Sequence, residues 1–245
     1  MSQLIWLEED GVEFPPTHSA LDDPNGLLAV GGALTPARLQ NAYRHGIFPW
    51  YSDGQPILWW SPSPRMALQP ENLHLGRSTK KLIKKRRFSV TVDQCFESVI
   101  QHCAEVKRQH EEGTWITDEI YQAYTKLNKL GFAHSVEAWD QGQLVGGLYG
   151  VCIGKAFFGE SMFSLASGAS KVAFSLLAMQ LQAWQFELID CQIYTDYLAS
   201  FGAEEMPREK FEQLLAKAVQ IPHSTDWADQ WTIPEFGPNS FDLIE

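Results

Sequence analysis

Residues 134–163 read HSVEAWDQGQLVGGLYGVCIGKAFFGESMF, a pattern that indicates consecutive β-strands. The tripeptides DQG and IGK interrupt the apolar runs, and each supplies the glycine that a tight turn favours. A mostly apolar helix is predicted at 170–185, and its lack of a polar face indicates burial. A further strand, LIDCQIY at 188–194, and a helix at 207–220 follow. Because strands and helices mix along the chain, we expect an α/β (α+β) fold.

Two further helices carry clear boundary signals. Residues 35–46 (TPARLQNAYRHG) have Thr35 as N-cap, a proline at the first helical position and a glycine past the end. Residues 117–131 have Thr117 as N-cap, acidic residues in the first turn and a closing glycine. A helix, antiparallel strands, a buried helix and another strand resemble the layout of the acetyltransferase-like (GNAT) fold.

The loop before the buried helix differs from what that fold usually contains. GNAT proteins usually hold the pyrophosphate of an acyl-coenzyme A on a glycine-rich loop at this helix N-terminus. Here the loop is SMFSLASGAS, residues 161–170, with one glycine and no G-x-G. We therefore expect an acyltransferase frame that uses no cofactor, with the acyl group carried by another molecule.

Residues 47–65, IFPWYSDGQPILWWSPSPR, contain five large aromatic residues and four prolines. Proline removes a backbone donor and fixes φ, so this aromatic segment cannot be a helix. Its aromatic side chains could serve core packing, a carbohydrate-binding surface or stacking of nucleobases. The two prolines of SPSPR indicate a linker. We expect a small N-terminal domain over residues 1–63 and a GNAT-like domain over residues 64–245.

Charge is unevenly distributed along the chain. The net charge is −11, yet residues 77–87 (RSTKKLIKKRR) contain seven of the nineteen basic residues, and no acid occurs between Glu71 and Asp93. Uninterrupted positive charges repel one another unless a polyanion neutralises them. A solvated helix face remains the alternative. We expect this basic run to contact a nucleic-acid backbone, and Lys80, Lys84 and Arg87 to share one helical face. Its members are Arg77, Lys80, Lys81, Lys84, Lys85, Arg86 and Arg87.

Several classes of protein are disfavoured by the sequence. The N-terminus is acidic early and has no long apolar run, so no signal peptide is expected. No stretch approaches the ~18 consecutive apolar residues of a membrane span. The four cysteines and seven histidines show no metal-ligand spacing, and unclustered cysteines indicate reduced thiols. We expect a cytoplasmic protein without a metal.

A set of motifs resembles one bacterial family. The motifs are PNGLLAVGG, AYRHGIFPWYSDGQPILWWSPSPR, EGTWIT, AHSVEAW, LVGGLYGV, FFGESMFS and LIDCQ. Together they resemble the leucyl/phenylalanyl-tRNA–protein transferase family over about Phe14 to Phe211. The resemblance implies transfer of Leu, Phe or Met from aminoacyl-tRNA to proteins beginning with Arg or Lys, which creates an N-degron for proteolysis. It also implies a small N-terminal domain joined to a GNAT-like domain.

Three positions depart from the family pattern. Ala33 stands where an acid is common, Ser63 interrupts the usual SPDPR, and Tyr197 stands where a histidine is frequent. These departures bear on substrate preference rather than on the activity. Neither the ranking of Leu, Phe and Met nor the protein targets follow from the sequence, and no oligomer is required.

The implied reaction is attack by an α-amine on the ester of an aminoacyl-tRNA. An α-amine has a pKa near ~8, so a useful fraction is neutral at cellular pH. Because the ester is already activated, positioning can supply most of the catalysis. This agrees with a sequence that shows no Ser/His/Asp or Cys/His signature.

Asp190 and Gln192 are the candidate catalytic pair. They lie two apart in an apolar strand, so their side chains share one face. Backbone capping at a strand end is the alternative, but the flanking Leu188, Ile189 and Ile193 indicate burial, which is costly for an unpaired carboxylate. The resemblance implies that Asp190 orients Gln192. A carboxamide is a very weak base, so we expect Gln192 to hydrogen-bond the incoming amine.

The resemblance also implies two binding regions. Trp50 and Trp115 flank the 3′ adenosine with Tyr124 nearby, and an aromatic face can stack a base for roughly 1–3 kcal/mol. Core packing is the interpretation for Trp59, Trp60 and Phe48. The aminoacyl side chain occupies an apolar pocket beside a glutamate. Its expected residues are Leu148, Phe157, Glu160 and Leu177.

Three other functions compete for the same residues. A non-enzymatic RNA-binding module explains the basic run and the tryptophans, but not the apolar-flanked Asp190 and Gln192. A coenzyme A acetyltransferase lacks its G-x-G loop here. A carbohydrate-binding protein leaves the basic run unexplained.

Overall fold

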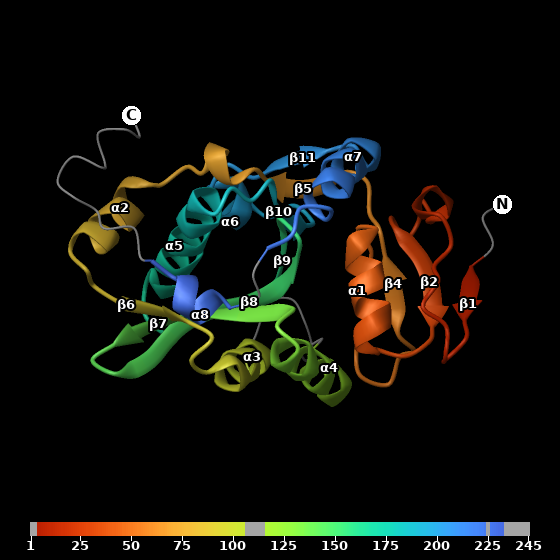
Figure 1. Ribbon diagram of the computed structural model, residues 1–245, viewed down its shortest axis with the longest axis horizontal. Coiled ribbons are helices and arrows are strands. Elements are labelled where there is room, and N and C mark those ends of the chain that lie inside the picture. The colour runs from red at the N-terminus through yellow and green to blue at the C-terminus, as the bar shows by residue number, and fades with distance from the viewer. Residues whose placement is uncertain (1–3, 106–115, 224–225, 233–245) are drawn as a thin grey trace.

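The computed structural model describes residues 4–105, 116–223 and 226–232 and contains two β-sheets (Figure 1). The smaller sheet is built from N-terminal strands, in which β1 pairs parallel to β2 and the other pairs are antiparallel. Its order is β1 (Ile5–Leu7), β2 (Leu27–Gly31), β4 (Leu58–Trp60) and β3 (Phe48–Pro49). The mixed α/β class predicted from the sequence, with a small N-terminal sheet and a larger sheet, is confirmed.

The larger sheet has seven strands and carries the cavity described below. The predicted strands of 134–163 are confirmed as β7, β8 and β9, which pair antiparallel in sequence order. At the first turn Gln141 and Gly142 both have positive φ (51° and 79°), as a type I′ hairpin requires. The order is β11 (Glu204–Met206), β5 (Arg65–Leu68), β10 (Leu188–Gln192), β9 (Ala156–Ser164), β8 (Gln143–Ile153), β7 (Ala133–Asp140) and β6 (Ser89–Val92).

The helices begin where the sequence supplies caps. The Thr35 hydroxyl accepts a hydrogen bond from the Arg38 amide (3.2 Å), and the Thr117 hydroxyl accepts one from the Ile120 amide (3.3 Å), so both predicted N-caps are confirmed. The helix over Phe96–Glu105 and the short elements near the C-terminus were not predicted. The α-helices are α1 (Pro36–Arg44), α2 (Arg77–Lys84), α3 (Phe96–Glu105), α4 (Asp118–Lys129), α5 (Ala169–Ala183), α6 (Asp196–Ala199), α7 (Arg208–Ala218) and α8 (Trp227–Gln230).

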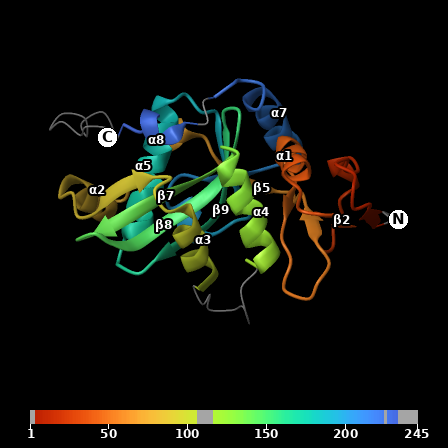
Figure 2. The same ribbon diagram turned by 60° about the horizontal axis from the view of Figure 1, so that its bottom comes forward.

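Helices cover both faces of the larger sheet (Figures 1 and 2). Strand β8 shows why, because its side chains alternate between two apolar cores. Tyr149 and Val151 belong to the core that contains α3 and α4, whereas Leu148 and Cys152 belong to the core around α5. Helix α5 is apolar nearly all round and is buried, as predicted. In the described ranges, no helix combines the length and apolar character needed to cross a membrane.

The chain passes from the smaller to the larger sheet between β4 and β5. One apolar core nevertheless contains residues from both sides, among them Tyr43 and Phe158. Helix α7 returns to pack beside α1 in both views (Figures 1 and 2), and a Cβ at Gly46 would lie 2.8 Å from the Phe211 ring. Residues 1–63 and 64–245 as separate domains therefore stay a prediction, and the two sheets share a core.

Candidate functional site

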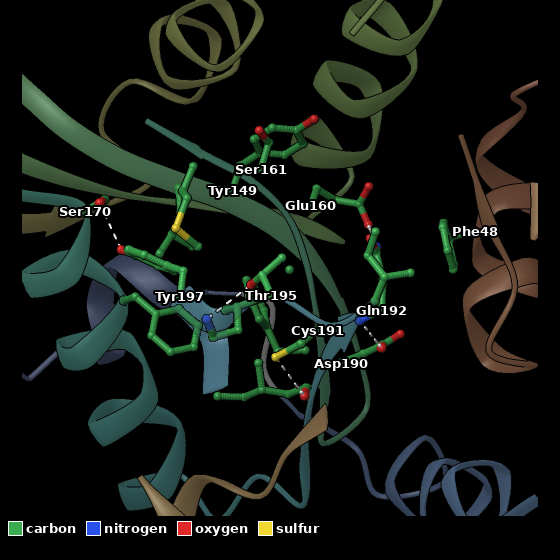
Figure 3. A pocket seen from close by; sticks show the side chains of 18 of the residues that line it. Phe48, Tyr149, Glu160, Ser161, Ser170, Asp190, Cys191, Gln192, Thr195 and Tyr197 are labelled. Carbon is green, nitrogen blue, oxygen red and sulfur yellow. Dashed lines mark hydrogen bonds between the residues drawn. The ribbon is translucent and has the colours of Figure 1, made fainter. Parts of the chain in front are cut away.

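A cavity of about 600 Å³ lies between the small sheet, the ends of β9 and β10 where these strands separate, and the start of α5 (Figure 3). Its wall is largely apolar, and Glu160 and Gln192 lie together where β9 and β10 separate, which we call the polar corner. The apolar wall includes Phe48, Leu148, Phe157, Met162, Phe163 and Phe174. Such a cavity can enclose a medium-sized apolar group and orient it by a few polar contacts.

The polar corner arises from the way two strands part. Strand β10 pairs parallel to β9 only as far as Asp190 opposite Phe158. Beyond that point Gln192 adopts a positive φ of 63°, and its register against β5 shifts. Glu160 on β9 and Gln192 on β10 therefore face the opening between the strands, with their side chains close together (Figure 3).

Asp190 is fully buried and forms a bidentate ion pair with Arg65. The Arg65 Nε lies 2.8 Å from Oδ1, and a terminal nitrogen lies 2.6 Å from Oδ2. The guanidinium also sits between the rings of Phe48 and Phe211, each 4.7 Å away. The cost expected for an unpaired carboxylate is thus avoided by a partner that the sequence did not reveal. Arg65, on β5 of the larger sheet, therefore also contacts β3 of the smaller sheet and α7.

Asp190 also holds the backbone of Gln192. Its Oδ1 accepts a hydrogen bond from the Gln192 amide nitrogen at 2.9 Å, which supports the left-handed backbone at that residue. With these three donors the carboxylate is engaged on both oxygens. Asp190 is consequently arranged to position Gln192 rather than to exchange a proton with a substrate.

Glu160 receives three hydrogen bonds in the cavity wall. The Tyr43 hydroxyl donates to Oε1 (2.8 Å), the Tyr124 hydroxyl to Oε2 (3.0 Å) and the Gln192 Nε2 to Oε1 (3.1 Å). The two tyrosine hydroxyls also hydrogen-bond each other. Burial raises the pKa of Glu160 to about 7, although the hydrogen bonds from its neighbours oppose the rise.

Comparison with known proteins identifies the family. The family model for leucyl/phenylalanyl-tRNA protein transferase matches residues 67–216, and the model for the N-terminal domain of the same family matches residues 32–63. The chain belongs to the leucyl/phenylalanyl-tRNA protein transferase family. The resemblance seen in the sequence motifs is confirmed.

Relatives of the transferase family match nearly the whole chain. The leucyl/phenylalanyl-tRNA–protein transferase of Teredinibacter turnerae is 62% identical over 219 residues, covering 89% of this chain and 85% of the relative. The protein of that name from Saccharophagus degradans is 57% identical over 241 residues, covering 97% and 99%. Identity at this level across both sheets places the cavity and its polar corner within the family match.

Solved structures resemble the transferase only loosely. L-PGS from Bacillus licheniformis superimposes with a TM-score of 0.37 at 10% identity, covering 71% of this chain and 57% of that one. A GCN5-related N-acetyltransferase from Kribbella flavida gives 0.32 at 12% identity, covering 73% and 63%. At these TM-scores the similarity carries no functional weight.

The expected aminoacyl pocket is only partly the observed one. Leu148, Phe157 and Glu160 line the cavity, whereas Leu177 is buried in the core around α5 and does not line it. Phe174, one turn earlier on α5, lines the cavity instead. Leu177, which the family resemblance implied, therefore stays a prediction that the lining of this cavity does not support.

The residues expected near the adenosine separate in the structure. Trp50 lines the cavity and is 39% exposed, and its ring packs against Trp60 at 5.9 Å. Tyr124 is fully buried, so its ring offers no face for stacking, and its hydroxyl serves Glu160. Trp115 lies outside the described residues. Trp59 is a core residue as interpreted, and Phe48 is both core and cavity wall.

The basic run starts on α2 but does not form one helical face. The helix ends at Lys84, and Arg86 adopts a positive φ of 49°. Arg87 therefore leaves the helix and forms a bidentate ion pair with Asp140, at 2.6 and 2.5 Å. Placing Arg87 on the face of Lys80 and Lys84 was wrong. Arg77, Lys81, Lys85 and Arg86 are exposed beside it.

The three departures from the family pattern occupy structural positions. The Ala33 carbonyl accepts a hydrogen bond from Arg38 (3.2 Å), and the Ser63 hydroxyl accepts one from the Arg208 amide (3.3 Å). Tyr197 lines the cavity and hydrogen-bonds Ser170 at 3.0 Å. Of the three, Tyr197 is the residue that can alter what the cavity accepts.

Cysteine and metal chemistry find no support at this site. All four cysteines lie in the described ranges, and no disulfide joins them. Burial raises the pKa of Cys95 to about 11 and that of Cys191, beside the cavity, further still. In the part of the chain that the structure describes, no group of three His, Cys, Asp or Glu side chains could hold a metal ion.

Proposed function

We propose that the chain transfers Leu, Phe or Met from aminoacyl-tRNA to the N-terminal amine of proteins beginning with Arg or Lys, marking them for proteolysis. Family membership supports the aminoacyl transfer. The observation that carries the proposal is an apolar cavity whose polar corner presents Gln192 and Glu160. The apolar wall suits the side chain being transferred, and the polar corner suits the reacting amine.

The hydrogen bonds of the corner assign an orientation to Gln192. A carboxylate can only accept, so Glu160 holds the amide nitrogen of Gln192 and turns its carbonyl oxygen away. That oxygen is then available to accept a hydrogen bond from the incoming amine. Nitrogen attacks the ester carbonyl carbon, the bond to the ribose oxygen breaks, and that oxygen leaves with a proton. Positioning of the two reactants supplies most of the rate.

The tRNA is held outside this corner. The exposed ring of Trp50 at the cavity edge suits the terminal adenine, and the basic run suits phosphates without reading sequence. Helix α2 lies beside the start of α5. Leu82 of α2 packs so closely on Gly168, the N-cap of α5, that a Cβ at this glycine would lie 2.5 Å from it. The basic run therefore adjoins the end of the cavity formed by α5.

A transfer assay tests the proposal directly. Phe-tRNA is incubated with a peptide beginning with Arg, and mass spectrometry measures addition of one phenylalanyl group. The matched peptide with an acetylated N-terminus should remain unmodified. Binding of the tRNA without any transfer would instead indicate an RNA-binding module, and transfer from phenylalanyl-coenzyme A would indicate a different acyl carrier.

Reversing the charge of the basic run should weaken tRNA binding. Lys81→Glu with Lys85→Glu should weaken binding to all tRNAs alike, and the slope of log K against log salt should fall by about 0.7–0.9 for each phosphate that the variant no longer neutralises. Filter binding at several salt concentrations measures both. Lys126→Glu with Lys129→Glu on exposed positions of α4 changes charge equally and should leave the slope unchanged. An unchanged slope in the first variant would return the run to solvated surface.

Shortening Phe157 should change which amino acid is transferred. Phe157→Ala removes apolar contact with the aminoacyl side chain, so transfer of Leu and Phe should lose about 1–3 kcal/mol in transition-state free energy. Competition between Leu-tRNA and tRNA charged with a smaller residue measures the preference. Because Phe157 is also buried against Trp227 (centroids 5.8 Å), the free energy of unfolding should fall as well.

A matched variant separates the two effects of Phe157. Phe186 is also buried against Trp227, at 6.1 Å, but it does not line the cavity. Phe186→Ala should therefore lower the melting temperature while keeping the relative preference for Leu and Phe. If Phe157→Ala kept the wild-type preference for Leu and Phe over smaller residues, Phe157 would serve core packing alone.

A further inference from the structure

Glu160 and its two tyrosines form a closed ring of three oxygen–oxygen contacts. The ring runs from Glu160 Oε1 to the Tyr43 hydroxyl, from there to the Tyr124 hydroxyl, and back to Glu160 Oε2. It contains three contacts, and each requires one hydrogen. The two hydroxyls supply only two, since each carries a single proton. A third proton completes the ring, and the carboxyl group is the member that can bind it.

The two protonation states of the ring differ in one hydroxyl. With Glu160 ionised, both tyrosines donate to the carboxylate and their own contact lacks a hydrogen. With Glu160 protonated, its O–H donates to Tyr124, Tyr124 donates to Tyr43, and Tyr43 donates to Oε1. Uptake of a proton therefore closes the ring by rotation of one hydroxyl, and no heavy atom has to move.

The ring is sealed on the core side and open to the cavity at Glu160. Tyr43 comes from α1 and Tyr124 from α4, and both are fully buried. Glu160 is partly exposed and lines the cavity beside Gln192. The titratable and charged groups that face the ring from the packed elements are those two tyrosines, Tyr149 of β8, and Asp190 of β10 with its partner Arg65 of β5.

We propose that Glu160, closed into this ring by Tyr43 and Tyr124, is the group that takes the proton from the acceptor's terminal ammonium. The proposal rests on the proposed function, because it assigns a proton acceptor to that reaction. Glu160 touches the reacting amine and is a catalytic residue, whereas Tyr43 and Tyr124 act through it and are positioning residues.

The proton balance of the step is complete. The ammonium gives one proton to Glu160, which leaves a neutral amine with a lone pair. That pair forms the N–C bond to the ester carbonyl, the C–O bond to the ribose breaks, and the second proton of the nitrogen leaves with the ribose oxygen. Glu160 then releases its proton to solvent through the open cavity. A base whose pKa lies near the working pH suits this exchange, and burial raises that of Glu160 to about 7.

Two measurements test the ring. Carbon-13 NMR of labelled glutamate carboxyls, with Glu160 assigned by its absence in Glu160→Gln, should show a midpoint near pH 7 in the wild type. Single-turnover transfer to an Arg peptide should rise with pH through the same midpoint, because only the carboxylate accepts a proton. In Glu160→Gln, transfer should fall by about 10²-fold or more.

The tyrosine variants test the pKa of Glu160, which would not change if the two tyrosines had only a structural role. The hydrogen bonds from Tyr43 and Tyr124 lower the pKa of Glu160, so Tyr43→Phe and Tyr124→Phe should each move the midpoint and the acid limb up, by about one pH unit. Tyr51→Phe is the control, because its buried hydroxyl bonds Glu119 (3.0 Å) away from the cavity. It should move neither.

The outcomes are distinguishable. An unmoved limb in both tyrosine variants, or a Glu160 midpoint below pH 5 in the wild type, would overturn the proton role while leaving the transfer reaction intact. Absence of transfer by the wild type would overturn the proposed function, and this role with it. If one tyrosine variant fails to fold, the other variant and the wild-type titration still decide.

Discussion

Asp190→Asn should lower the free energy of unfolding by about 3–5 kcal/mol, because it leaves the Arg65 guanidinium buried without its counter-charge. Both side chains are at most 1% exposed, so water cannot replace the missing partner. Transfer by the folded fraction should also fall, since a neutral carboxamide accepts the Gln192 backbone hydrogen bond less strongly than the carboxylate that supports this residue at its positive φ. Chemical denaturation and single-turnover transfer measure the two losses, and a tRNA-binding titration should change little.

Two further variants locate the cause. Arg65→Met with Asp190→Leu replaces the whole pair by apolar groups, which is often neutral or stabilising for buried pairs, so stability should recover. Transfer should not recover, because a leucine side chain gives the Gln192 backbone amide no acceptor. Asp140→Asn breaks the same bidentate geometry at the exposed Arg87 and should change stability little. An Asp190→Asn protein as stable and active as the wild type would refute both roles of this carboxylate.

The Arg65 pair shows what local pattern could and could not predict. Asp190 and Gln192 were predicted from their spacing in an apolar strand and from the family resemblance, both of which are read from a short stretch of sequence. Their partners come from far along the chain, since Arg65 is 125 residues from Asp190 and Tyr43 is 117 from Glu160. Contacts between residues this far apart produce no periodic pattern in the local sequence, so the sequence pattern could not predict them. One feature of the sequence could have indicated that Arg65 is buried and paired. It is the single charged residue at the start of an apolar strand, directly after the two prolines of SPSPR.

For the helices, the sequence predicted their existence better than their ends and the faces they present. The existence of α5 follows from its apolar run, but which of its faces meets the cavity does not; Phe174 lines the cavity, whereas Leu177, implied by the resemblance, does not. The basic run predicted a helix that in fact ends at Lys84, because the positive φ at Arg86 is a backbone choice that a run of basic residues does not encode. Capped helices such as α1 and α4 were confirmed because Thr35 and Thr117 satisfy exposed amides locally.

Gln192→Met should reduce single-turnover transfer by about 10²–10³-fold, comparable to the loss of one preorganised polar group at a reacting centre. Methionine keeps the length of the side chain but offers the amine no carbonyl oxygen. The backbone amide that bonds Asp190 is retained, and tRNA affinity should stay near that of the wild type because Trp50 and the basic run lie elsewhere.

Gln192→Met should also change the pKa of Glu160, and Gln185→Met is its matched control. Loss of the Gln192 Nε2 removes a donor to ionised Glu160, so the NMR midpoint of Glu160 should rise. Gln185 also has a positive φ, at 58°, but it is exposed and does not line the cavity. Gln185→Met should leave transfer and the midpoint unchanged, which separates the amide chemistry from the cost of a left-handed backbone. A folded Gln192→Met protein that transfers at the wild-type rate would show that the attacking amine is oriented by other groups, and the polar corner would then have to act through Glu160 alone.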